Sequence, residues 1–241
     1  KITNGGILVY NEDDAEVKRV SEAATNPIRK LPYSTPAYSV SDGVTLLETP
    51  EGPMPIEVFG AHNLNNLAGA KWICQNMGVD EADFYEAIAS FKGASKRLEK
   101  IAEGKGRVAY KDFAHSPSKV AATTKAVKEQ YPNRTLVACL ELHTYSSLNA
   151  EFLKEYEGAL EYADEAVVFY SPDAVKIKQL EEVTYEQIAK AFNRKDLIIY
   201  TNPAEFKQYL FNRNLDNSAL LLMSSGNYGG LNFDEVKQLI E

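Results

Sequence analysis

The chain has 241 residues, of which 44% are hydrophobic and 25% charged, and this composition excludes a disordered or fibrous protein. The formal net charge of −8 argues against nucleic-acid or anionic-membrane partners, since both require a basic surface. No apolar run approaches the ~20 residues of a membrane span, and the N-terminus has no signal-peptide pattern. The length suggests two modest domains, and we expect a cytoplasmic protein.

The two cysteines favour core packing in a reducing compartment over a structural zinc site. Cys74 and Cys139 lie in apolar periodic segments, with no C-x-x-C pair and no histidine at metal spacing. We therefore expect no metal ligands in this chain. The chain lacks an initiator methionine and enters a strand-like run at 6–10 almost at once, which suggests that it was cut from something longer.

The first part of the chain predicts a strand at 6–10 and then a helix through Val17, Val20 and Ala23. Turn signals then separate short β-rich pieces, which predicts a small antiparallel meander over 37–59 with strands at 44–47 and 56–59.

Two helices follow the meander. One runs through Leu67 and Cys74 to Gly78, and the next begins with Asp80 as its N-cap. Residues 92–106 are basic, contain glycine and have few large apolar side chains, so we place a domain boundary there. The predicted domains are 1–93 and 94–241.

The second domain alternates strand-like runs with amphipathic helical segments. Continuous apolar strands separated by such helices indicate an α/β, Rossmann-like fold with a parallel sheet that is covered on both faces. Ligands of such sheets lie at the carboxyl ends of the strands. The predicted strands are 107–110, 135–140, 165–170, 197–200 and 219–223, and one of the helical segments carries Phe152, Tyr156 and Leu160.

Four segments carry polar residues that could bind a ligand. Three of them follow predicted strands, and the fourth stands at the start of a helix in the first domain. After the first strand, Ser116 can cap a helix that has Pro117 at its first position, and Asp112 and His115 could orient a nucleotide or an amine. An ordinary capping turn with a solvent-facing histidine explains the same residues.

After the second strand come His143, Tyr145 and Ser146, and after the fifth comes the segment 224–230 with Ser225 and Asn227. The glycines of that segment could bring its backbone close to a ligand, or the segment could be a flexible loop. It is not G-x-G-x-x-G, so a dinucleotide fingerprint is absent.

In the first domain, His62, Asn63 and Asn66 stand at the start of a helix. Their amides can read the edge of a base, although capping and packing also explain them.

Taken in order, four motifs resemble the Mur ligase family of ATP-dependent enzymes. GAHNLNNLAGA is similar to its Gly-x-His-Asn-x-x-Asn helix start, and FKGASKRLE to its Phe-x-Gly-x-x-x-Arg-x-Glu segment. YKDFAHSPSK is similar to its Asp-Tyr-Ala-His-x-Pro turn, and LELHTYSS occupies the place of its strand-end His motif. The resemblance implies the later half of the central ATPase domain over 1–93 and the acceptor-binding domain over 94–241.

The resemblance also implies roles for individual residues. Asn63 and Asn66 would contact adenine with His62 nearby, and Arg97 would reach the phosphates or the ribose. The implied catalytic residues are Arg97, Asp112 and His115, and the implied nucleotide-binding residues are His62, Asn63, Asn66, Arg97, Asp112 and Ser116.

The family joins amino acids or peptides to UDP-N-acetylmuramate with ATP and Mg²⁺, through an acyl phosphate. This chain lacks the G-x-x-G-K-[ST] loop, and the Mg²⁺ ligands are expected upstream of it, so we expect the chain alone to be inactive. We further expect 92–106 to act as a hinge that assembles the site on closure.

Several departures bear on the acceptor. Lys111, Ser116 and Thr144 stand where the alanine-adding members have Asp, His and Arg. The missing arginine disfavours a single small amino acid and favours a larger acceptor, and the resemblance implies the tripeptide L-Ala-γ-D-Glu-meso-diaminopimelate. The expected acceptor contacts are His143, Tyr145, Ser146, Ser225 and Asn227. The alternatives are an alanine-adding ligase, a folylpolyglutamate synthetase with a glutamate acceptor, and a noncatalytic flavodoxin-like module that binds a peptide or nucleotide.

Overall fold

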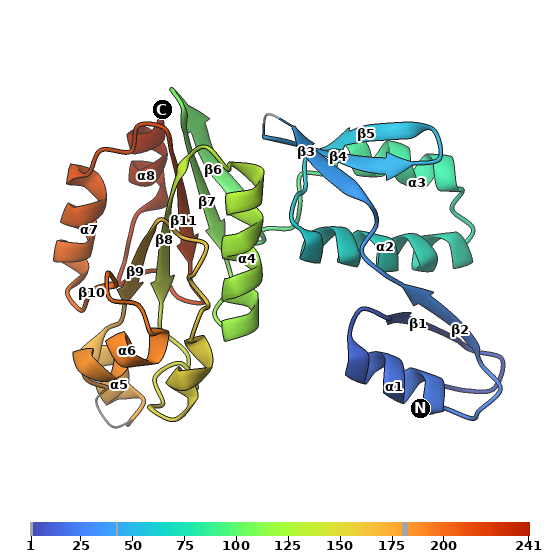
Figure 1. Cartoon of the computed structure of the whole chain (residues 1–241), viewed down its shortest axis with the longest axis horizontal. Helices are drawn as coiled ribbons and strands as arrows, with labels where there is room; N and C mark the ends of the chain where they lie inside the picture. Colours follow the sequence, from blue (N-terminus) through green and yellow to red (C-terminus); the bar gives the residue numbers. More distant parts are fainter. Residues whose placement is uncertain (1, 42, 180–182) are drawn as a thin grey trace. The chain divides into compact units, whose positions relative to one another are not determined.

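The computed structural model describes residues 2–41, 43–179 and 183–241, and the chain divides into two compact units at Lys92 and Gly93. The first unit has two small sheets and the second has one six-stranded sheet, and each unit has its own helices (Figure 1). Among the described residues, no helix combines the length and the apolar character that crossing a bilayer requires.

The first unit opens with a parallel pair of strands and a helix between them. β1 (Ile7–Asn11) pairs with β2 (Arg29–Tyr33), and α1 (Ala15–Ala23) connects them. The Asp14 side chain caps α1 by accepting from the backbone N–H groups of Glu16 and Val17. The strand and the helix predicted at the start of the chain are both present.

An antiparallel meander and two helices complete this unit. The strands β3 (Tyr38–Ser41), β4 (Val44–Thr49) and β5 (Gly52–Ile56) form a three-stranded sheet. α2 (Ala61–Asn76) and α3 (Glu81–Ala89) follow. The core of the unit consists of Leu47, Ile56, Leu64, Leu67 and Phe84.

Two strands of this unit differ from the prediction. The strand expected at 56–59 lies instead at β5, and β2 was not predicted at all. Both β5 and β2 carry proline, which normally argues against a strand because it lacks an N–H donor. Both are edge strands, where that missing donor is tolerated. Asp80 occupies the N-cap position of α3, as predicted, although its side chain makes no capping hydrogen bond.

The second unit is built on a six-stranded sheet with the order β10-β9-β8-β11-β7-β6. All neighbouring pairs are parallel except β6 with β7, which confirms the predicted α/β class with a largely parallel sheet. The five predicted strands are present with small changes at their ends. In chain order the strands are β6 (Glu99–Gly104), β7 (Arg107–Asp112), β8 (Thr135–Glu141), β9 (Glu165–Phe169), β10 (Ile198–Tyr200) and β11 (Ser218–Met223).

Helices cover both faces of this sheet (Figure 1). α4 (Pro117–Gln130) packs against β8 and β11 on one face, where the Thr124 hydroxyl contacts the Met223 sulfur. α7 (Pro203–Asn212) and α8 (Phe233–Ile240) share a core with the opposite face of the same strands. α6 (Tyr185–Phe192) packs against the 3₁₀ helix η1 (Phe152–Tyr156).

Three further expectations for this unit were wrong. Residues 99–104 of the expected boundary segment form β6, where three charged residues and a glycine had masked an edge strand. The helix expected through Phe152 and Leu160 is only the 3₁₀ turn η1, because the chain turns at Gly158 with a φ of 74°. The short helix α5 (Pro172–Ile177) was not predicted.

Candidate functional site

The carboxyl ends of β8 and β11 form a switch point in the second unit. The two strands are parallel neighbours, with Leu140 opposite Met223. The chain after β8 continues into η1, which packs against α4, whereas the chain after β11 continues into α8 on the other face of the sheet. Ligands of open α/β sheets bind where neighbouring connections diverge in this way.

A buried carboxylate joins these two strand ends. Glu141, the last residue of β8, has only 3% of its side chain exposed. Its Oε2 accepts hydrogen bonds from the Ser224 hydroxyl and from the backbone N–H of Tyr228 at 2.8 Å. Its Oε1 lies 3.7 Å from Nδ1 of His143. A buried charge is tolerated when donors surround it in this way.

The loop 224–230 is fixed by its own tyrosine. The Tyr228 side chain is 1% exposed, its hydroxyl lies 2.8 Å from the carbonyls of both Cys139 and Met223, and its ring stacks on Phe206. The structure thus contradicts the flexible-loop reading of this segment. Burial raises the pKa of the Tyr228 phenol well above its ordinary value, so the hydroxyl stays protonated as a donor.

Three other residues of this loop have different surroundings. A Cβ at Gly226 would lie 2.8 Å from Glu141 Oε2 and 3.0 Å from the His143 ring, so only glycine fits there without displacement. The Ser225 hydroxyl oxygen is buried and has no hydrogen-bond partner among the described residues. Asn227 is exposed, and its side-chain oxygen accepts from the Gly230 N–H at 3.2 Å.

The segment after β8 is a compact turn that presents an aromatic ring. The Thr144 hydroxyl accepts from the Ser147 N–H at 3.2 Å and lies 3.2 Å from the Ser146 hydroxyl. Tyr145 is 64% exposed, and the ammonium of Lys178 lies 4.8 Å from the centre of its ring. The structure therefore brings His143, Tyr145 and Ser146 to the same strand end.

Asp112 is the last residue of β7, and Ser116 stands at the start of α4. The Asp112 carboxylate is buried and accepts from the N–H groups of Leu98 and Ala114, both at 2.6 Å. Ser116 stands at the N-cap of α4 with Pro117 at the first helical position, as predicted, but its side chain makes no capping hydrogen bond. Arg97 is exposed on the turn that Asp112 holds.

His115 is oriented by its neighbours. Its Nδ1 lies 2.8 Å from the Phe113 carbonyl oxygen, and only a protonated Nδ1 can donate there. The Tyr156 hydroxyl donates to the His115 carbonyl. Nε2 is thereby the ring nitrogen left to accept a proton or contact a ligand.

In the first unit, the predicted adenine-binding residues lie on the first turns of α2. Asn63 donates from Nδ2 to the Phe59 carbonyl at 2.9 Å, His62 is half-buried and Asn66 is exposed. The intervening Asn65 has a different task, since its Nδ2 lies within hydrogen-bond distance of Asn11, Asp13 and Thr35. α2 has no side-chain cap and no acidic residue in its first turn.

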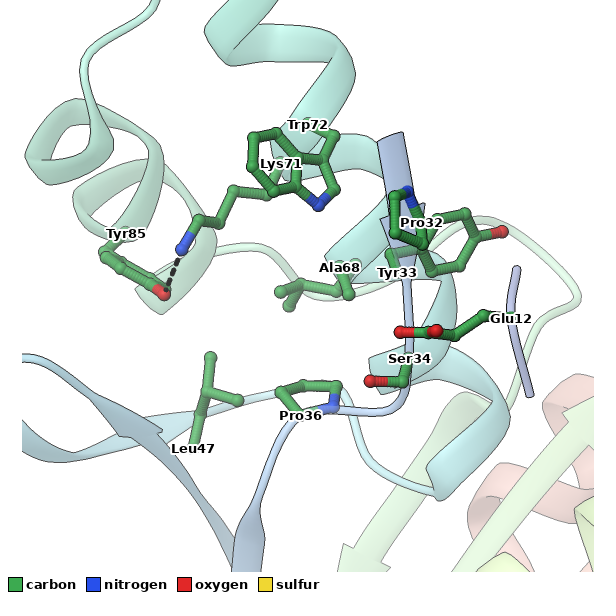
Figure 2. A pocket seen from close by; sticks show the side chains of 11 residues that line it. Glu12, Pro32, Tyr33, Ser34, Pro36, Leu47, Ala68, Lys71, Trp72 and Tyr85 are labelled. Atoms are coloured by element: carbon green, nitrogen blue, oxygen red, sulfur yellow. Dashed lines mark hydrogen bonds between the residues drawn. The ribbon is translucent and has the colours of Figure 1, made fainter. Parts of the chain in front are cut away.

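A hollow of about 260 Å³ lies further along α2 (Figure 2). Trp72 lies across it from Pro36 and Leu47, and the Lys71 side chain extends toward the Tyr85 hydroxyl, 2.9 Å from its ammonium. Lys71 also pairs with Glu81, so its charge is already balanced. His62, Asn63 and Asn66 are not among the residues that line the hollow.

No group of three His, Cys, Asp or Glu side chains with metal-binding geometry occurs in residues 2–41, 43–179 and 183–241. Cys74 and Cys139 are both free, and Cys139 is fully buried, which raises the pKa of its thiol. Core packing of the cysteines therefore agrees with the structure.

Sequence reasoning missed three residues of this edge: Glu141, Lys178 and Tyr228. For Glu141 a signal existed, because a carboxylate directly follows the apolar run 136–140. The glycines around Tyr228 suggested a loop, and nothing in the local sequence places Lys178 beside Tyr145.

Known proteins resemble this chain in sequence and in fold. A family model described as Mur ligase, glutamate ligase domain, matches residues 96–226, more than half of the 241-residue chain. A UDP-N-acetylmuramate–L-alanine ligase from Caldicellulosiruptor bescii is 30% identical over 180 residues, which is 70% of this chain and 39% of that protein. The chain thus spans about two fifths of this relative.

Solved structures show the same fold. A murein peptide ligase from Psychrobacter arcticus matches with a TM-score of 0.62 and 17% identity over 100% of this chain and 52% of that one. A MurF ligase from Thermotoga maritima in complex with ADP matches with a TM-score of 0.66 and 17% identity, over 99% of this chain and 53% of that one.

Proposed function

Because this chain belongs to the Mur ligase family, we propose that it is part of an ATP-dependent amide ligase of peptidoglycan metabolism. The observation that carries the proposal is that the family match, residues 96–226, spans the ends of β7, β8 and β9 and reaches the first part of the loop after β11. The relatives are much longer than this chain, so the activity is proposed for the complete gene product.

The proposed reaction joins an acceptor amine to the carboxylate of UDP-N-acetylmuramate. ATP phosphorylates that carboxylate, and the amine then displaces phosphate from the acyl phosphate to form the amide. Positioned donors stabilise the oxyanion of such a reaction. Mg²⁺ would be held by residues outside this chain, and it supplies charge neutralisation for the phosphates.

For the nucleotide we propose contacts from Asn63 and Asn66 to adenine, with His62 nearby. The exposed Asn66 amide offers both a donor and an acceptor, which fits the edge of a base. From the second unit we propose that the charged guanidinium of Arg97 and Nε2 of His115 contact phosphate or ribose oxygens.

Asp112 and Ser116 complete the proposed nucleotide set. The buried Asp112 carboxylate supports this role by fixing the turn that carries Arg97, through its bond from the Leu98 N–H. Ser116 lies at the N-cap of α4 with a side chain not used for capping.

For the acceptor we propose the peptide L-Ala-γ-D-Glu-meso-diaminopimelate, as in a murein peptide ligase. Thr144 supports this choice, because its hydroxyl is used inside the turn and it provides no cation for the carboxylate of a small amino acid. His143, Tyr145, Ser146, Ser225 and Asn227 are the proposed contacts.

L-Alanine is the second candidate acceptor, because the Caldicellulosiruptor relative carries that activity in its name. The test is ADP release by the complete gene product with UDP-N-acetylmuramate and either acceptor. Release with the tripeptide alone supports the first candidate, and release with alanine supports the second. No release with either acceptor would favour a noncatalytic binding module.

A further inference from the structure

Lys178 lies at the candidate acceptor site, beside the ring of Tyr145. It directly follows α5, and α5 follows β9, the strand next to β8, so the chain brings it to the same carboxyl edge as Tyr145. Its ammonium lies 4.8 Å from the centre of the Tyr145 ring. Among the described residues, none of the carboxylates lies within ion-pair distance of it.

The neighbouring lysine of the same helix provides a contrast. Lys176 is exposed and lies 4.0 Å from the Asp173 carboxylate, three residues earlier, as expected for an ordinary surface pair. Lys178 is half-buried against an aromatic ring instead. A ring holds an ammonium through its π face and satisfies none of its three N–H donors, which stay available to an anion.

From this contrast we infer that Lys178, held by Tyr145, receives a carboxylate of a peptide acceptor. The inference rests on the proposed acceptor site. It assigns the acceptor specificity of that site to Lys178, which lies outside the turn after β8. The Thr144 hydroxyl is committed to its own turn, so the cation for a carboxylate comes from the adjacent strand end. Lys178 can bind an anion although the chain as a whole has a net charge of −8.

The test compares two acceptors that differ only in charge. Binding of the tripeptide and of the same tripeptide with its carboxyl groups amidated is measured by calorimetry, with the chain as described here. We expect the free carboxylates to bind about tenfold more tightly, because a charge-assisted hydrogen bond contributes a factor of this order. Lys178→Gln should abolish that difference, and Lys178→Arg should restore it.

Lys176→Gln is the matched control, since it removes the same charge from the same helix. It should leave the tenfold preference unchanged. Tyr145→Leu should reduce the preference by removing the ring that holds the ammonium. If Lys178→Gln and Lys176→Gln reduce the preference equally, the inference about Lys178 is wrong. It is also wrong if the preference survives in Lys178→Gln. Either result leaves the proposed acceptor site standing. If wild-type chain binds neither peptide, the acceptor assignment fails and the inference fails with it.

Discussion

The carboxylate of Glu141 accepts a hydrogen bond from the backbone N–H of Tyr228 at 2.8 Å, which ties the end of β8 to the loop after β11. The two residues are 87 positions apart in the sequence, and the Ser224 hydroxyl donates to the same oxygen. Because all three groups are partly or fully buried, this contact fixes the geometry of the candidate acceptor site before any ligand arrives.

Replacing Glu141 should therefore destabilise the second unit. Glu141→Ala should lower the free energy of unfolding by roughly 2–3 kcal/mol, because hydrogen bonds to charged groups contribute about this much and the buried N–H of Tyr228 loses its acceptor. Glu141→Gln should cost less, since its amide oxygen still accepts. Urea denaturation measures both, with the exposed Glu161→Ala as control. An Ala variant as stable as the control would show that the contact is not structural.

Tyr228→Phe tests a second anchor of the same loop, the hydroxyl of Tyr228. The change removes the hydroxyl that lies 2.8 Å from two buried carbonyls but keeps the ring that stacks on Phe206. We expect a loss of about 1–2 kcal/mol, since a buried acceptor is left without its donor. Tyr145→Phe removes a hydroxyl from a ring that is 64% exposed and should change stability by less than about 0.5 kcal/mol. Similar losses in both variants would contradict this account.

The sequence predicts the parts of this fold whose signal is local. Buried parallel strands such as β8 and β11 read as continuous apolar runs, and their ends could be placed within a residue or two. The strands β2, β5 and β6 were missed or displaced because edge strands tolerate proline and charge, which obscures the pattern.

The site was predictable only in part, for a related reason. The polar residues after each strand mark its carboxyl edge, so His143, Tyr145 and Ser225 could be proposed from topology. What they contact depends on residues far along the chain, as the pairing of Glu141 with Tyr228 and of Lys178 with Tyr145 shows. Local periodicity carries no information about such contacts.

Two adjacent asparagines of α2 should separate binding from stability. Asn65 links α2 to the segments after β1 and β2, so Asn65→Ala should lower the free energy of unfolding of the first unit by about 1–2 kcal/mol. Asn66 is exposed, so Asn66→Ala should leave stability nearly unchanged while weakening nucleotide binding in the complete gene product. Thermal denaturation and ADP titration measure the two effects. If Asn66→Ala leaves the nucleotide affinity unaltered, Asn66 does not contact adenine.

Gly226→Ala should disturb His143. The added methyl group would lie 2.8 Å from Glu141 Oε2 and 3.0 Å from the His143 ring, and Glu141 is held by its own donors. The histidine ring is therefore the group that moves, at a cost of about 1–3 kcal/mol for overpacking. Nuclear magnetic resonance should show shifted His143 ring signals, with those of His115 unchanged as the internal control. Unshifted His143 signals would mean that the loop moves instead.

Glu99 should make the turn before β6 sensitive to acid. Partial burial raises its pKa, but the Lys96 N–H at 2.7 Å and the Lys111 ammonium at 2.9 Å outweigh burial and hold the pKa below its ordinary value. A carboxylate with a lowered pKa stabilises the fold above its unfolded pKa of about 4.3, and this stabilisation disappears as the pH falls through the folded pKa. Glu99→Gln should therefore lower the melting temperature at pH 7 by an amount that corresponds to less than about 1 kcal/mol, because solvent screens the pair. The difference from wild type should shrink as the pH falls below the unfolded pKa and vanish once the pH is below the lowered folded pKa. A difference that stays constant from pH 7 to pH 3 would show that Glu99 acts through packing rather than through its charge.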